Sequence, residues 1–126
     1  IHNTMYLKFL DFDYSEDADG SGTFDSMASV APAQRDALHG EIRAVLAWAH
    51  AHWPGSCGPL EEGGLWHYDL QGVQEVSTPL ELRFDEASGE VHSAAGVPAP
   101  PRTTITLTVS GAAEFCAALR DAFGLD

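Results

Sequence analysis

The sequence is poor in basic residues. It has 6 Lys and Arg against 19 Asp and Glu, so the 126-residue chain carries a formal net charge of −13. A surplus of negative charge of this size repels the phosphates of nucleic acids and the anionic headgroups of membranes. We therefore expect neither a nucleic-acid partner nor a membrane partner, whereas a basic protein or a cationic ligand is compatible with the charge.

Cysteine is also scarce. Cys57 and Cys116 are the only two, and they show neither the CxxC spacing of a zinc or redox site nor the density of a disulfide-rich secreted domain. The sequence has no apolar run long enough to span a membrane, and its first residues lack the basic segment of a signal peptide. These absences predict a cytoplasmic protein with free thiols, no metal site and no cofactor.

The hydrophobic content is typical of a folded protein. Hydrophobic residues make up 44% of the chain and aromatic residues 10%, which favours a globular domain over a disordered tail. A length of 126 residues is close to the commonest domain size. We therefore predict one domain spanning residues 1–126.

Apolar patterning predicts two helices and a series of strands. Residues 32–53 and 111–123 place apolar side chains at helical spacing, with a proline at the start of the first segment and a glycine after the second. Strand patterns fall at residues 5–14, 23–30, 65–76, 80–85 and 103–109, with a short partner strand around Val91.

The order β-β-α-β-β-β-α indicates an α+β fold. We expect a mostly antiparallel sheet of about five strands with both amphipathic helices packed on one face. A ferredoxin-like arrangement is the alternative topology, although the opening strand pair fits its βαββαβ order poorly.

The stretch DADGSGTFDSMA, residues 17–28, partly matches the EF-hand calcium-loop pattern. Its ligand positions fall on Asp17, Asp19, Ser21, Thr23 and Asp25. Position 12 is Ala28 where the pattern requires a bidentate glutamate, and the preceding segment has a strand pattern where a helix is required. We interpret the stretch as an acidic turn between two strands, with calcium binding at residues 17–25 as the weaker alternative.

Acidic side chains crowd around this turn, and no Lys or Arg occurs between Lys8 and Arg35. The cluster consists of Asp11, Asp13, Asp17, Asp19 and Asp25. Such an anionic lobe suits the capture of a basic partner, because opposite charge raises the association rate and favours the correct partner. Our principal hypothesis is a non-catalytic binding or interaction module whose partner is a basic protein or a small ligand.

A small enzyme or a ligand pocket is the alternative hypothesis. His67 and Asp69 share the polar face of one predicted strand, where a carboxylate can orient an imidazole for acid–base chemistry. Cys57, in the glycine-rich loop 56–64, is a candidate nucleophile. The sequence contains neither a nucleophile elbow nor a phosphate-binding loop with its lysine, so we expect a protein that is not an enzyme.

Overall fold

The computed structural model describes residues 4–125, which form six strands and two helices. The strands are β1 (Asp13–Glu16), β2 (Gly22–Val30), β3 (Trp66–Glu75), β4 (Leu80–Asp85), β5 (Glu90–Ala95) and β6 (Arg102–Gly111). The helices are α1 (Arg35–His52) and α2 (Ala113–Phe123). The predicted α+β class with two helices and mostly antiparallel pairing is confirmed, but the strands number six and not about five.

Four strands form the main sheet, in the order β1-β2-β6-β3, and each neighbouring pair is antiparallel. Because β2 and β3 both run opposite to β6, they run parallel to each other, and β2, α1 and β3 form a split βαβ unit. The ferredoxin-like alternative is not confirmed. Two strands precede α1 and four strands separate the two helices, which is not the βαββαβ order.

The hydrophobic core lies between one face of this sheet and the two helices. The buried positions of β2 and β6 alternate along each strand: Phe24, Ser26, Ala28, Val30, Ile105, Leu107 and Val109. The helices contribute Leu38, Ile42, Val45 and Ala49 from α1, and Phe115, Cys116, Leu119 and Phe123 from α2. No helix among residues 4–125 is long and apolar enough to cross a membrane.

Residues 5–12 do not form a strand, so the strand predicted over residues 5–14 is wrong for most of its length. Only β1, at the end of that segment, joins the sheet. Leu10 of this segment is buried, and Leu7, Phe9 and Phe12 pack against the core from outside the sheet, whereas Met5 and Tyr6 are exposed. The aromatic and aliphatic content that suggests a strand here serves core packing instead.

The segment is held in place by a carboxylate of α1. The backbone N–H groups of Lys8, Phe9 and Leu10 donate hydrogen bonds to the Glu41 carboxylate at 2.7, 3.0 and 3.0 Å. Three consecutive amides around one carboxylate form an anion-binding concavity of the backbone. Glu41 thus supplies the hydrogen bonds that a neighbouring strand would otherwise provide.

Replacing Glu41 by glutamine should lower the free energy of unfolding by about 1–2 kcal/mol, because a neutral amide oxygen accepts weaker hydrogen bonds than a carboxylate. Urea denaturation measures the loss, and hydrogen exchange should show faster exchange at the amides of residues 8–10. Glu75→Gln, an exposed position on β3, is the control and should change stability little. Equal stability of the Glu41→Gln variant and the control would show that the segment is held by other contacts.

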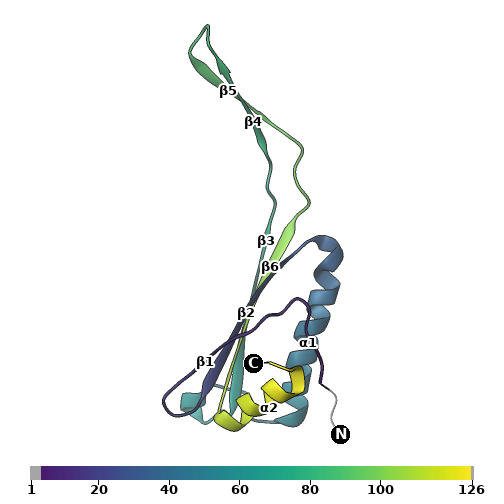
Figure 1. Ribbon diagram of the computed structural model, residues 1–126, viewed down its shortest axis with the longest axis vertical. Helices are drawn as coiled ribbons and strands as arrows, with labels where there is room; N and C mark the ends of the chain where they lie inside the picture. The colour runs from purple at the N-terminus through teal and green to yellow at the C-terminus, as the bar shows by residue number, and fades with distance from the viewer. Residues whose placement is uncertain (1–3, 126) are drawn as a thin grey trace.

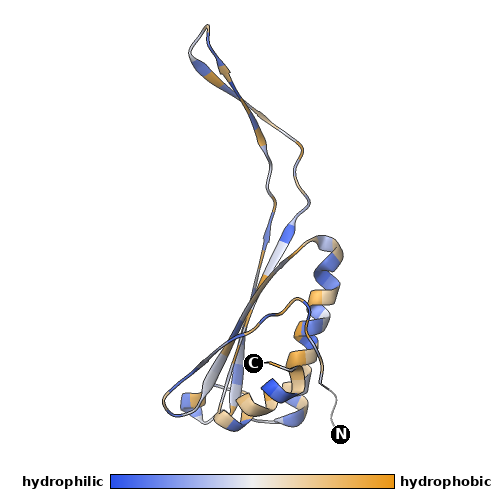
Figure 2. Ribbon diagram, viewed as in Figure 1, coloured by the Kyte–Doolittle hydropathy of each residue, from blue (hydrophilic) through white to orange (hydrophobic). Residues whose placement is uncertain are grey.

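A long hairpin arm projects from the main sheet (Figure 1). We define the arm as residues 76–101; it carries β4 and β5, which pair with each other as a separate two-stranded sheet. Hydrophobic and hydrophilic residues alternate along it (Figure 2). The predicted strand at residues 80–85 and its partner around Val91 are confirmed, although the sequence does not show that they leave the body of the molecule.

Candidate functional site

A hollow lined by carboxylates lies where the β1–β2 turn, the loop before β3 and the start of α2 meet. Its volume is about 590 Å³. The acidic residues that line it are Asp17, Asp19, Glu61 and Glu114, and the other lining residues are Ser21, Leu60, Gly64, Ala112 and Ala113. None of these lining residues is basic. We call this site the acidic hollow; its three segments lie at the end of the molecule opposite the arm tip (Figure 1).

The β1–β2 turn carries two of the carboxylates, those of Asp17 and Asp19, and fixes the second. Asp17 N–H donates to the Ser21 carbonyl at 2.8 Å, which closes the hairpin, and Gly20 supplies a residue with φ of 91°. The Ser21 hydroxyl and backbone N–H donate to Asp19 Oδ1 at 2.7 and 3.1 Å. These bonds lower the pKa of the Asp19 carboxyl, the hydroxyl contributing most. The predicted acidic turn between two strands is confirmed, and Asp19 is held ionised within it.

The fold adds Glu61 and Glu114 to the turn. Glu61 lies in a single 3-10 turn, Leu60–Glu62, that ends at Gly63 in the left-handed conformation. Glu114 lies in the first turn of α2, where the positive end of the helix dipole favours an acid. Glu61 and Glu114 cannot be identified from the sequence pattern, because their approach to Asp17 depends on packing between segments that are distant in sequence.

The remaining acids of the predicted cluster lie elsewhere. Asp11 is exposed in the segment before β1, while Asp13 and Asp25 face each other in the β1–β2 register. Asp25 accepts a hydrogen bond from Thr108 Oγ1 at 2.8 Å, on the face of the sheet opposite to the buried side chains. The structure therefore divides the predicted cluster: Asp17 and Asp19 line the acidic hollow, and the other three do not.

A metal centre finds no support in this geometry. Within residues 4–125, no three side chains of His, Cys, Asp or Glu are placed to hold a metal ion. Asp25, which would be a ligand in the calcium-loop pattern, is hydrogen bonded on the sheet instead. Calcium binding at residues 17–25 therefore stays an alternative prediction that none of these contacts supports.

His67 and Asp69 lie two residues apart on β3, on the face of the sheet that neither helix covers. The Asp69 carboxylate accepts a hydrogen bond from Gln71 Nε2 at 2.8 Å. Cys57 is exposed and forms an isolated parallel bridge with Trp66 at the edge of β3. None of the three candidates lines the acidic hollow, so the enzyme hypothesis gains no support from the geometry and stays a prediction.

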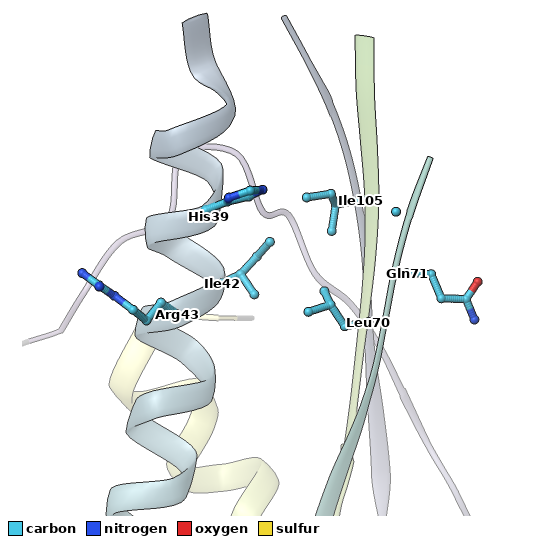
Figure 3. A pocket seen from close by; sticks show the side chains of 7 residues that line it. His39, Ile42, Arg43, Leu70, Gln71 and Ile105 are labelled. Atoms are coloured by element: carbon cyan, nitrogen blue, oxygen red, sulfur yellow. The ribbon is translucent and has the colours of Figure 1, made fainter. Parts of the chain in front are cut away.

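An apolar hollow of about 330 Å³ lies between α1 and β3 (Figure 3). His39 and Ile42 point from α1 toward Ile105 and Leu70, while Arg43 and Gln71 point away from the gap. The volume is at the lower end of the range for ligand pockets. Because His39 is the one labelled polar side chain that points inward, the hollow defines no particular ligand chemistry.

Tyr14 lies beside the acidic turn, on β1. Its hydroxyl donates a hydrogen bond to Glu16 Oε1 at 2.9 Å, and the guanidinium carbon of Arg120 lies 3.9 Å from the ring centre. Partial burial raises the pKa of the Tyr14 phenol to about 12, and the hydrogen bond to Glu16 adds to the rise. The folded protein therefore favours the neutral phenol.

We expect one tyrosine to ionise near pH 12 in an ultraviolet absorbance titration, and Tyr14→Phe should remove that step. The folded-state pKa lies above the ordinary value of 10.0. The stabilising contribution of the neutral phenol is therefore fully present below about pH 10 and is lost as the pH rises through about 12. A late step that persists in the Tyr14→Phe variant would assign it to another residue.

Comparison with known proteins gives no family for the chain. No protein-family model matches it, and neither a curated protein nor a solved structure matches it significantly. Its function has to be inferred from the geometry and charge of the molecule itself.

Proposed function

We propose that the protein is a non-catalytic binding module whose acidic hollow receives basic side chains of a protein partner. The observation that carries the proposal is the lining of this hollow: four carboxylates from three separate segments, with no basic residue among the lining side chains. The pocket near His67, Asp69 and the loop 56–64 and the calcium loop at residues 17–25 are alternatives that no specific observation favours.

Four carboxylates around one hollow produce a negative potential that a single surface acid does not. Two opposite charges 4 Å apart attract by about 1 kcal/mol in water and by more where the surroundings are partly dry. Each lysine or arginine side chain that enters the hollow lies near several carboxylates at once. The net charge of −13 adds a long-range attraction that raises the association rate of a cationic partner.

The site is also partly preorganised. The Asp19 carboxylate is fixed by two hydrogen bonds from Ser21, and the backbone of Glu114 is fixed in the first turn of α2. A carboxylate held in position loses less conformational entropy on binding than a free side chain. Arginine suits such a site better than lysine, because its planar guanidinium presents five N–H donors in a rigid arrangement that can bind a carboxylate through two parallel hydrogen bonds.

Titration calorimetry with an oligo-arginine peptide tests the proposal. We expect saturable binding at low salt that weakens as the salt concentration rises, because salt screens attraction between exposed charges. An oligo-serine peptide of the same length is the neutral control and should not bind. Absence of binding at low salt, or binding that salt does not weaken, would contradict the proposal.

A further inference from the structure

The arm exposes an apolar face. Its strand register places Leu82 opposite Ser93 and Phe84 opposite Val91, so these side chains point to the same side of the two-stranded sheet. The exposed fractions on this side are 61% for Leu80, 67% for Leu82, 61% for Phe84 and 66% for Val91. A two-stranded hairpin alone is marginally stable in water, and exposed apolar patches mark interaction surfaces. This face of the arm is therefore suited to association.

The opposite face of the arm carries its charges. Glu81, Arg83 and Asp85 alternate with the apolar residues along β4, and His92 Nε2 lies 3.8 Å from Asp85 Oδ2 across the hairpin. Glu81 and Arg83 lie opposite Ala94 and His92 in the register. Neither forms an ion pair within the part of the chain that the structure describes. The outer edge of β4 has no neighbouring strand in the two-stranded sheet, so its backbone groups are free to pair.

We propose that β4 pairs with β4 of a second copy of this chain, antiparallel and centred on Leu82. A twofold axis through Leu82 places Leu80 opposite Phe84 on the apolar face, twice by symmetry. On the charged face it places Glu81 opposite Arg83, again twice. Cross-strand pairs of apolar residues and of opposite charges both stabilise antiparallel sheets.

The charges select this register over its neighbours. An axis through Glu81 would place the two Glu81 carboxylates opposite each other, and an axis through Arg83 would oppose the two guanidiniums. If the pairing register were shifted by one residue, the apolar side chains of one copy would lie on the same side of the sheet as the charged side chains of the other. An axis through Phe84 would also oppose Arg83 and Asp85, but it pairs only three residues of β4 and places Leu82 opposite Glu86. The register centred on Leu82 pairs five residues of β4 and satisfies both faces, which makes β4 self-complementary.

A second copy fits this surface better than the basic partner proposed for the acidic hollow. The apolar face of the arm presents no carboxylate to attract a cation. A second arm offers an apolar face of its own, and in the antiparallel orientation its Arg83 and Glu81 meet Glu81 and Arg83 of the first arm. The arm extends away from the main sheet, so antiparallel pairing places the two acidic bodies at opposite ends (Figure 1). The repulsion between two chains of net charge −13 is thereby reduced. This inference does not depend on the proposed function.

Cysteine cross-linking tests the register. Leu82→Cys, made in a Cys57→Ser background to remove the exposed thiol, should form an intermolecular disulfide under mild oxidation, because the two side chains meet on the axis. Glu81→Cys in the same background is the matched control. In the proposed register position 81 of each copy lies opposite Arg83 of the second copy, so the two introduced thiols are two residues apart along the strands. This distance is beyond the reach of a disulfide, and the variant should remain reduced. Equal cross-linking of both variants, or of neither, would overturn the proposed register.

Charge exchange tests the pairing without a cross-link. Sedimentation equilibrium of the wild-type chain should show a concentration-dependent dimer. Glu81→Arg and Arg83→Glu should each weaken it by at least about tenfold, and the double exchange should restore it, since opposite charges then face each other again. The single variants change the net charge in opposite directions, so weakening by both cannot come from overall repulsion. A wild-type chain that stays monomeric, or a double exchange that does not restore the dimer, would overturn the proposal.

Discussion

Replacing Trp66 by alanine should lower the free energy of unfolding by about 3–5 kcal/mol. Trp66 is 0% exposed, although it lies in β3, an edge strand of the main sheet. Its ring stacks on Phe115 of α2, with centroids 5.5 Å apart and planes 3° apart, and meets His50 of α1 edge-on at 4.9 Å. Truncation would open a cavity where the sheet and both helices meet.

Urea denaturation measures this loss, and Tyr68→Ala is the matched control. Tyr68 lies two residues further along the same face of β3, but it is 37% exposed. Its truncation should cost clearly less, because much of its ring is already in water. Equal losses for the two variants would mean that Trp66 does not tie the edge strand to the helices.

Removing the arm should abolish dimerisation and leave the body folded. Glu75 and Arg102 face each other in the β3–β6 register, so an Asn-Gly pair replacing residues 76–101 can form a two-residue hairpin turn there. The large apolar side chains of the arm are exposed and none belongs to the buried core, so the body loses no core contact. We expect the free energy of unfolding to change by less than about 1 kcal/mol.

The shortened chain has two readouts. Sedimentation should show a monomer at every concentration at which the wild-type chain dimerises, and circular dichroism should show that α1 and α2 are retained. A shortened chain that still dimerises would place the interface on the body. A shortened chain that unfolds would mean that the arm supports the body, contrary to the exposure of its side chains.

Patterns local in sequence predict much of the body. The helical spacing of Leu38, Ile42 and Val45 corresponds to buried positions of α1, and the alternation of Ile105 and Leu107 to the buried side of β6. These predictions hold because each element buries one face. The buried residues therefore recur about every 3.6 positions in a helix and every second position in a strand. The acidic turn between β1 and β2 is predicted correctly for a similar reason, since aspartate and glycine favour turns.

Features that depend on distant residues are not predicted. Residues 5–12 have the apolar content of a strand, but three of their amides bind Glu41 of α1, which lies more than thirty residues away in sequence. In β4, apolar and charged residues alternate as they do in a strand of the body. This alternation does not show whether the apolar side is covered by a helix or left exposed, as it is in the arm. Glu61 and Glu114 join Asp17 and Asp19 only once α2 and the loop before β3 have packed. The acidic hollow is therefore a property of the fold.

The acidic hollow is tested most directly by two variants of equal net charge. One neutralises its lining with Asp17→Asn, Asp19→Asn, Glu61→Gln and Glu114→Gln. The other neutralises four acids outside it with Asp11→Asn, Glu75→Gln, Glu86→Gln and Glu90→Gln. Each variant removes four negative charges from the chain, so long-range attraction falls equally in both, and only the first alters the site.

The decisive measurement is the affinity of both variants for the oligo-arginine peptide at low salt. We expect the variant with the neutralised hollow to bind at least about tenfold more weakly than the wild-type chain, since it loses several close charge contacts. The variant with the neutralised outer acids should stay close to wild type. Equal affinities of the two variants would contradict the account, because the attraction would then come from net charge and not from the acidic hollow.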